Sequence, residues 1–506
     1  MEKAHYPLLP GAVPHSYSAP RHPSQLGTRT RFALAGFLAG ALVFGGLWRA
    51  GLTDLSVGYL NSATVSDPAG APLKGSFLHI SDIHVDANYV QGATLDSYCH
   101  RFPKRKGDPE NEDLYVAGRF GAPVSSCDSP IRLVDITFNW INRTVAHGLD
   151  FVVYTGDRAL GSAQVPVIHV VGNNDVEPHN LLTPGPNPML RGLYEAWQEY
   201  IPADQKDLYL EMGYYTRPIA PGHLRAVALN TQWFHTSNDV IGACRKPKHP
   251  GSRQLVWLRE ILAEATANGE AVVIAGHVAP EFDDYYNSCY KRYTHLMNEF
   301  RDTIRGQFFG HNNKDHFYFL SSDAKSRREN IKALPPPDVS VLPAAPEPIA
   351  VRGSVQIMKR VPSMIRELMQ HFKKVWDDRD KVDYTVVNIS PSVIPTFNPT
   401  LRVYRYQYPS FVSPFRLPIG TLLDYDQFWL NLTEANDEFR QSGDVLYQPE
   451  YELLYSARQQ YSMPDLTTQS YLDLAHRMTQ NKTLRQQFAE YLCVMAGLQE
   501  DSYVSI

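Results

Sequence analysis

Carboxylate, imidazole and amide side chains recur directly after short apolar runs of the sequence. They are Asp82 and His84 (DIH), Asp157 (TGD), Asn173, Asn174 and Asp175 (GNND), His277 (AGH), and His311 and Asn313 (GHNN). Together, carboxylates and imidazoles suit divalent transition metals, since imidazole binds zinc, iron or manganese and a carboxylate neutralises charge. If Asp82 and His84 lie in extended chain, both side chains point to one face and can reach one ion. Each motif alone is typical of a polar turn, but the ordered set indicates a metal site.

The apolar runs before these residues predict the elements that position them. Strands are predicted at residues 76–81, 150–155, 165–171, 224–229, 271–275, 306–309, 384–389 and 400–406. Helical spacing of apolar residues occurs at 131–147, 254–267 and 364–376. This alternation predicts a layered α/β domain whose functional side chains lie on loops at strand ends.

The order of these motifs resembles that of the calcineurin-like metallophosphoesterases. Longer segments look like those of fungal endopolyphosphatases, with the acid sphingomyelinases as more distant relatives. These segments read HISDIHVD, GNNDVEPHN, GPNP, GQFFGHNNKDHF and NISPSVIPTFNPTLRVYRY. The resemblance covers about residues 76–410 and implies a metallophosphoesterase domain there, an α/β layered β-sandwich flanked by helices.

The resemblance also implies a two-metal site and a reaction. One metal would be held by Asp82 and His84, Asp157 would bridge both, and Asn173, His277 and His311 would hold the second. The divalent cations would be Zn, Mn, Co or Mg, and the implied substrate is inorganic polyphosphate. A hydroxide activated by two metals would then cleave internal phosphoanhydride bonds to give shorter chains.

Two positions depart from the broader superfamily but match the endopolyphosphatase variant. Asn174 stands where many relatives have a histidine that protonates the leaving group. Asp175 would orient metal-binding groups. Asn174 and Asp175 are the two predicted catalytic residues. Asn313 stands where many relatives have a second metal-binding histidine, and an amide oxygen holds such a metal more weakly than imidazole does. His179 and His316 lie nearby in the sequence and are candidates to compensate.

The connection after Asp157 is short. Only seven residues, 158–164, separate it from the next strand-like run, whereas parallel neighbouring strands usually need a dozen or more. One interpretation is an internal deletion of a segment that the family carries, which would put the activity in doubt. The alternative is a genuine short connection, antiparallel or looped.

The N-terminal region predicts a membrane anchor. Residues 32–48 are uncharged and apolar, and extending the run to residue 52 gives a length that spans a bilayer. Arginines precede the run, so residues 1–31 are expected to be a disordered cytosolic tail and 53–75 a lumenal stalk. With the resemblance, this predicts a single-pass type II protein of the vacuole membrane with a lumenal catalytic domain. A cleaved signal peptide is the alternative.

Two further features lie beyond the apolar run. All five cysteines do, which permits disulfides and leaves at least one thiol free or paired between chains. So do four glycosylation sequons, at Asn142, Asn388, Asn431 and Asn481.

Composition narrows the choice of partner. The 506 residues carry a formal charge of -5, which argues against a general nucleic-acid binder. Basic runs at 104–106, 245–248 and 325–328 are candidates for binding polyphosphate, although such runs are more often solvated surface. A proline-rich insertion is predicted within about 321–382, and residues 411–506 are predicted to be a helical region that forms a lid or cap. Oligomeric state stays open.

Two alternatives to the endopolyphosphatase remain. One is a phosphodiesterase acting on lipid headgroups, like acid sphingomyelinase, although no cysteine-rich saposin-like segment precedes residue 76. The other is a catalytically weak membrane protein that binds polyphosphate without turnover, left by the deletion.

Overall fold

The structure is a computed structural model that describes residues 75–103, 116–157, 165–281, 283–323, 352–408 and 417–497. All of these belong to one compact unit, residues 62–506. The predicted tail, anchor and stalk lie outside the described residues, as do the basic runs at 104–106 and 325–328. Among the described helices, none is both long enough and apolar enough to cross a membrane.

The described chain forms two six-stranded sheets. The first has the order β14 (Glu452–Ser456), β13 (Leu422–Trp429), β12 (Thr400–Tyr406), β1 (Gly75–Ile80), β4 (Phe151–Tyr154) and β5 (Val167–His169). The second has the order β10 (His316–Ser321), β11 (Tyr384–Ile389), β9 (Ile304–Phe309), β8 (Ala271–Ala275), β7 (Leu224–Ala228) and β6 (Tyr215–Ala220). A short pair, β2 (Val85–Asp86) and β3 (Ser129–Pro130), lies apart from both.

Each sheet contains a block of parallel strands, which in the first sheet extends to the edge strand β5. In the first sheet β1, β4 and β5 run parallel, and in the second β7, β8, β9 and β11 do. The flanking strands pair antiparallel with them. Because the carboxyl ends of parallel strands meet at one edge of a sheet, residues that follow these strands gather there.

The two sheets pack face to face through aromatic side chains. Phe77 of β1 stacks on Phe151 of β4 with ring centroids 4.7 Å apart, and it meets Phe308 of β9 edge-on at 5.2 Å. Phe308 also contacts Tyr404 of β12 at 5.0 Å. Such pairs stabilise a core beyond the area that they bury, by ~1 kcal/mol each. The predicted layered α/β architecture is therefore confirmed.

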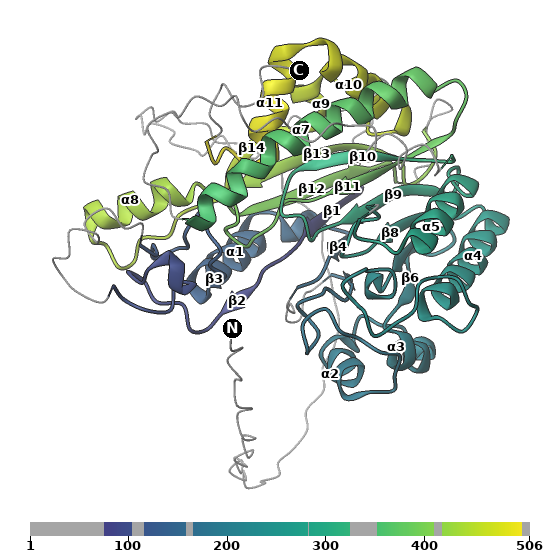
Figure 1. Cartoon of the computed structure of the whole chain (residues 1–506), viewed down its shortest axis with the longest axis horizontal. Helices are drawn as coiled ribbons and strands as arrows, with labels where there is room; N and C mark the ends of the chain where they lie inside the picture. The colour runs from purple at the N-terminus through teal and green to yellow at the C-terminus, as the bar shows by residue number, and fades with distance from the viewer. Residues whose placement is uncertain are drawn as a thin grey trace, which may run out of the picture. The chain divides into compact units, whose positions relative to one another are not determined.

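Helices cover the outer faces of both sheets. α1 (Ile131–Thr144) buries Leu133 and Trp140 against Leu78 and Val152, the residues of β1 and β4 that point away from the second sheet. α4 (Pro250–Asn268) and α5 (Asn287–Glu299) lie side by side over the second sheet (Figure 1). The remaining helices are α2 (Pro188–Trp197), α3 (Lys206–Met212), α7 (Arg352–Asp378), α8 (Leu432–Ser442), α9 (Ala457–Tyr461), α10 (Thr468–Gln480) and α11 (Lys482–Leu492).

The C-terminal region contributes more than the predicted helices. Besides α8 to α11 it supplies β13 and β14, which extend the first sheet at one edge. β13 lacks an apolar pattern because Asp424 and Asp426 lie within it. Both carboxylates bind the guanidinium of Arg405 on the neighbouring strand β12. Because these carboxylates form ion pairs with a neighbouring strand, β13 lacks the apolar alternation from which a strand is predicted.

The predicted insertion is also partly ordered structure. Residues 324–351, which hold its proline-rich part, lie outside the described residues. The end of β10 and the whole of α7 fall within 321–382, and α7 buries Ile365, Phe372 and Val375 in the main core.

The short connection after Asp157 joins parallel neighbours. β4 and β5 pair in parallel, with Val152 opposite Val167 and Tyr154 opposite His169. The antiparallel alternative is therefore wrong. Residues 158–164 lie outside the described residues, so the deletion stays a hypothesis.

Candidate metal centre

The structure brings the predicted ligands together at the carboxyl ends of the parallel strands. Asp82 follows β1, Asp157 follows β4, His277 follows β8 and His311 follows β9. Positive φ angles at Asp82 (50°), Asp157 (66°) and His311 (68°) turn the chain sharply as each strand ends. Non-glycine residues in this region are strained, and such strain concentrates at functional sites.

The carboxylate of Asp157 lies between two groups of donor atoms. Its Oδ2 is 3.0 Å from Nε2 of His84 and 3.3 Å from Nε2 of His277. The pKa of Asp157 would be raised by burial, but the neighbouring His277 and His84 lower it well below its usual range. An ionised carboxylate shared by two imidazoles is suited to bridging two cations.

The first group consists of Asp82, His84 and Asp157, whose ligand atoms all lie within 4.8 Å of one another. Asp82 Oδ1 is 3.7 Å from His84 Nε2. On the other side of the ring, His84 Nδ1 is 3.5 Å from Oδ1 of Asp128. This carboxylate orients the imidazole so that Nε2 faces the group, as outer carboxylates do for metal-bound histidines. Burial lowers the pKa of His84, but the three carboxylates together raise it well above its ordinary value.

The second group is a triangle of donor atoms from Asn173, His277 and His311. Asn173 Oδ1 is 2.7 Å from His277 Nε2 and 2.9 Å from His311 Nδ1, and these two nitrogens are 3.2 Å apart. His277 Nδ1 donates to the carbonyl of Thr155 at 2.7 Å, which directs Nε2 into the triangle. Ligands bound at about 2.0–2.2 Å to one ion stand about 3 Å apart when adjacent, so the triangle fits one cation.

The two imidazoles of this group differ in their electrostatics. Burial lowers the pKa of His277, but Asp157 and Asp82 outweigh it and raise the pKa to about 9. Burial and the neighbouring His277 lower the pKa of His311 to about 4. The carboxylates of Asp157 and Asp82 therefore outweigh burial at His277 but not at His311.

Asn174 and Asp175 both act on Asp157. The backbone N–H of Asn174 donates to Asp157 Oδ1 and its side-chain amide donates to Oδ2, both at 2.8 Å. Asp175 Oδ2 accepts the backbone N–H groups of Asp157 at 3.0 Å and Gly172 at 2.8 Å. These are the contacts of positioning residues, since they hold the bridging carboxylate and join the loops after β4 and β5.

The predicted ligand role of Asn313 stays a prediction, and one observation is compatible with it. Its Oδ1 is buried and has no hydrogen-bond partner among the described residues. A buried oxygen without a partner is costly unless a cation or water satisfies it. His316, one of the candidates to compensate for Asn313, points elsewhere: its Nε2 is 3.7 Å from Glu281.

Three further residues lie at the centre, and only His179 among them is a candidate from the sequence. His179 Nε2 accepts a 2.8 Å hydrogen bond from the amide of Asn173 and so fixes which amide atom enters the triangle. His235 lies edge-on to His311 with ring centroids 5.6 Å apart, held by Asp284. Asp128, the partner of His84, follows Cys127 without a preceding apolar strand. Among these three residues, only His179 has a sequence signal, which is its position in GNNDVEPHN.

Two glycines allow the loops to approach the carboxylates. A Cβ at Gly172 would overlap Oδ1 of Asp157, and one at Gly310 would overlap Ser81 and lie 2.6 Å from Oδ2 of Asp82. Only glycine fits where backbone and a buried carboxylate come this close.

Gly172→Ala is therefore expected to displace the bridging carboxylate and to lower kcat at least about 100-fold, since small misplacements of reacting groups have effects of this order. The checks are steady-state kinetics and metal content. Gly192→Ala is the matched control, because its Cβ would meet nothing within 4 Å. Equal activity of the two variants would contradict the geometry.

Donor groups on both sides of one carboxylate, at the ends of parallel strands, are an arrangement suited to hold two metal ions. Proteins named endopolyphosphatase in several fungi are similar to this chain. It is 33% identical over 396 residues to that of Cryptococcus neoformans, which covers 66% of this chain and 58% of that protein. It is 26% identical to that of Saccharomyces cerevisiae over an alignment of 594 residues, which covers 85% and 86% of the two chains. These matches confirm the relationship to fungal endopolyphosphatases.

Other comparisons add less. No family model matches the chain. A solved dimetal phosphatase from Danio rerio is 14% identical and covers 48% of this chain and 83% of its own, with a TM-score of 0.28.

Proposed function

We propose that this chain is a metal-dependent endopolyphosphatase of the calcineurin-like type, which cleaves internal phosphoanhydride bonds of inorganic polyphosphate. The observation that carries the proposal is the Asp157 oxygen shared between two groups of metal-binding atoms. The endopolyphosphatase names of the fungal relatives support the substrate.

Each residue has a place in this reaction. Asp82 and His84 would hold one divalent cation. The second cation would be held by Asn173, His277 and His311. Asp157 would bind both cations. Bound there, two cations would supply a hydroxide at neutral pH and would neutralise charge on the phosphate oxygens. Asn174 keeps the Asp157 carboxylate oriented through two hydrogen bonds, and His179 keeps the Asn173 oxygen pointing inward.

The leaving group explains why asparagine suffices at position 174. A polyphosphate fragment leaves as a stable anion, whereas an alkoxide needs a proton from a general acid. The amide of Asn174 is engaged with Asp157 and cannot supply one. This favours phosphoanhydrides over phosphoesters of poor leaving groups.

Metal removal tests the proposal. Treating the purified protein with a chelator is expected to abolish the shortening of long-chain polyphosphate on a gel, and adding back Mg, Mn, Co or Zn should restore it. Fragments of intermediate length indicate internal cleavage, while orthophosphate alone indicates cleavage from the ends. No shortening with any of the four metals would contradict the proposal, and release of phosphocholine from sphingomyelin would favour the phosphodiesterase instead.

We also propose that the catalytic part lies in the lumen of the vacuole, tethered by the N-terminal apolar run. Two disulfides, Cys99–Cys127 and Cys244–Cys289, support an oxidising compartment, and the fifth cysteine, Cys493, is buried and free. Asn142 and Asn481 are exposed sequons, and Asn431 is half-buried at the start of α8.

The sequon at Asn388 requires a correction. This residue lies inside β11 with 3% exposure, and its Oδ1 accepts a hydrogen bond from Tyr471. A glycan cannot be accommodated there in the folded protein. Asn142→Gln is expected to remove one glycosidase-sensitive step of mass in protein expressed in a fungal host, and Asn388→Gln none. A mass shift for folded Asn388→Gln would show that the sequon is used.

A further inference from the structure

An open pocket of about 550 Å³ lies beside the first turn of α4. Four of its lining side chains are cationic: Arg245, Lys246, Arg253 and Arg292. Tyr214 and Trp257 form an aromatic wall, with ring centroids 4.4 Å apart. Only one lining residue, Glu260, is acidic. In a chain of net charge -5, this is a local concentration of positive charge.

Most of this charge has no counter-ion among the residues that the structure describes. Arg245 and Lys246 are exposed and form no ion pair with any described residue. Arg292 donates only to neutral oxygens, the carbonyl of Cys244 at 3.1 Å and the hydroxyl of Ser252 at 2.9 Å. Arg253 alone is paired, to Glu211 at 2.7 Å. Three cationic groups around one pocket thus remain available to a ligand with several negative charges.

The backbone adds to this field. α4 begins at Pro250 and runs to Asn268, and Ser252 and Arg253 of its first turn line the pocket. The positive end of a helix of this length favours anions, phosphate in particular. The side-chain and backbone charges therefore act in the same direction.

The pocket is built on a loop that is tied to the metal centre. Residues 229–249 leave the carboxyl end of β7 and lead into α4. The N–H of Val278, next to His277, donates to Thr231 in this loop at 3.0 Å, and the Cys244–Cys289 disulfide fixes its far end to α5. Figure 1 shows α4 and α5 side by side on the flank of the sheet that carries His277 and His311. The pocket thus keeps a fixed position relative to the ligands.

We propose that this pocket binds one stretch of a polyphosphate chain while another stretch of the same chain, with the bond to be cleaved, lies at the metal centre. The inference rests on the proposed function. A linear polyanion can occupy both places at once, so the second contact raises the effective concentration of substrate at the metals. Long chains are expected to gain from this, whereas tripolyphosphate, with only three phosphates, is expected to gain nothing.

Binding is measured first, independently of turnover. In Asp157→Asn protein, which is expected to cleave too slowly to consume substrate during the measurement, Arg245→Glu with Lys246→Glu is expected to weaken affinity for long-chain polyphosphate by at least about tenfold, because two attractive contacts become repulsive. Lys381→Glu with Lys482→Glu, at two exposed lysines outside the pocket, makes the same change in net charge and should alter affinity less than about twofold. Equal weakening by both pairs would overturn the proposal.

Kinetics of the otherwise unmodified enzyme give the second readout. The pocket pair should raise KM for long chains about tenfold and leave kcat and KM for tripolyphosphate unchanged. An equal loss on both substrates would overturn the proposal, since it would mean damage to the metal centre. If the protein hydrolyses neither substrate, the proposed function fails, and the binding comparison still decides whether the pocket takes polyphosphate.

Discussion

Asp157→Asn is expected to lower the rate of polyphosphate cleavage by about three orders of magnitude, which corresponds to ~4 kcal/mol of activation free energy. The substitution keeps the shape of the side chain and removes the negative charge between His84 and His277. Two cations held close together repel each other, and the bridging carboxylate is the group that offsets this. Both the rate and the stoichiometry of bound metal should therefore fall.

Kinetics and metal analysis of the purified variant provide the measurement. Asp135→Asn is the matched control, because Asp135 is an exposed residue of α1 and its substitution should leave both quantities unchanged. The cleavage rate of Asp128→Asn should lie between those of the other two variants, about 10- to 100-fold below the parent rate. This is the usual effect of removing a carboxylate that orients a metal-bound histidine. If Asp157→Asn kept full activity and two bound metals, Asp157 would not be the bridging ligand.

The convergence of the ligands was predictable from the sequence because strand ends carry them. Asp82, Asp157, His277 and His311 each follow an apolar run, and parallel strands deliver such residues to one edge. The direction of each side chain was not predictable. Asn174 turns back onto Asp157, and this depends on the left-handed backbone at Asp157 and on the absence of a side chain at Gly172. No periodicity encodes either feature.

The fold shows the same division between apolar and polar signals. β8, β11 and β12 have the bounds that their β-branched and aromatic runs predict. β13 was missed because its buried acidic residues make sense only once Arg405 on another strand is present. Hydrophobic periodicity therefore identifies elements buried through apolar contact, whereas pairing between distant charged residues has no local signature.

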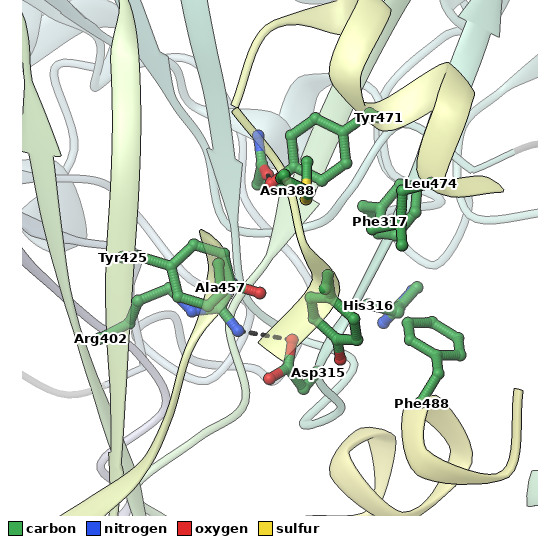
Figure 2. A pocket seen from close by; sticks show the side chains of 12 residues that line it. Asp315, His316, Phe317, Asn388, Arg402, Tyr425, Ala457, Tyr471, Leu474 and Phe488 are labelled. Atoms are coloured by element: carbon green, nitrogen blue, oxygen red, sulfur yellow. Dashed lines mark hydrogen bonds and ion pairs between the residues drawn. The ribbon is translucent and has the colours of Figure 1, made fainter. Parts of the chain in front are cut away.

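A second buried ion pair links the C-terminal region to the metal centre. Arg402 of β12 is 2% exposed and binds Oδ1 of Asp315, and the two point toward each other in Figure 2. The ring of Tyr425 lies 4.1 Å from the guanidinium carbon. The second carboxylate oxygen of Asp315 accepts from Tyr455, and its backbone N–H donates to the carbonyl of Leu492 at 3.1 Å. The segment that carries His311 and Asn313 is thus anchored from β12, β14 and α11.

Arg402→Met is expected to destabilise the protein by ~3–5 kcal/mol, because it leaves the buried carboxylate of Asp315 without its cation. Arg402→Met combined with Asp315→Leu removes both charges and should recover a large part of this loss. Denaturant unfolding measures both variants. Arg143→Met, which breaks an exposed pair with Glu450, is the control and should change stability by less than ~1 kcal/mol.

The ion pair should also matter for activity. Asp315 is two residues from Asn313, so if the pair anchors the loop, Arg402→Met below its unfolding transition should bind the second metal less tightly than the parent protein. Metal titration of the folded variant measures this. If the variant loses stability but keeps its metal affinity, Arg402 contributes to stability alone. The His311 loop would then be held by its own contacts with Asp82 and Asn173.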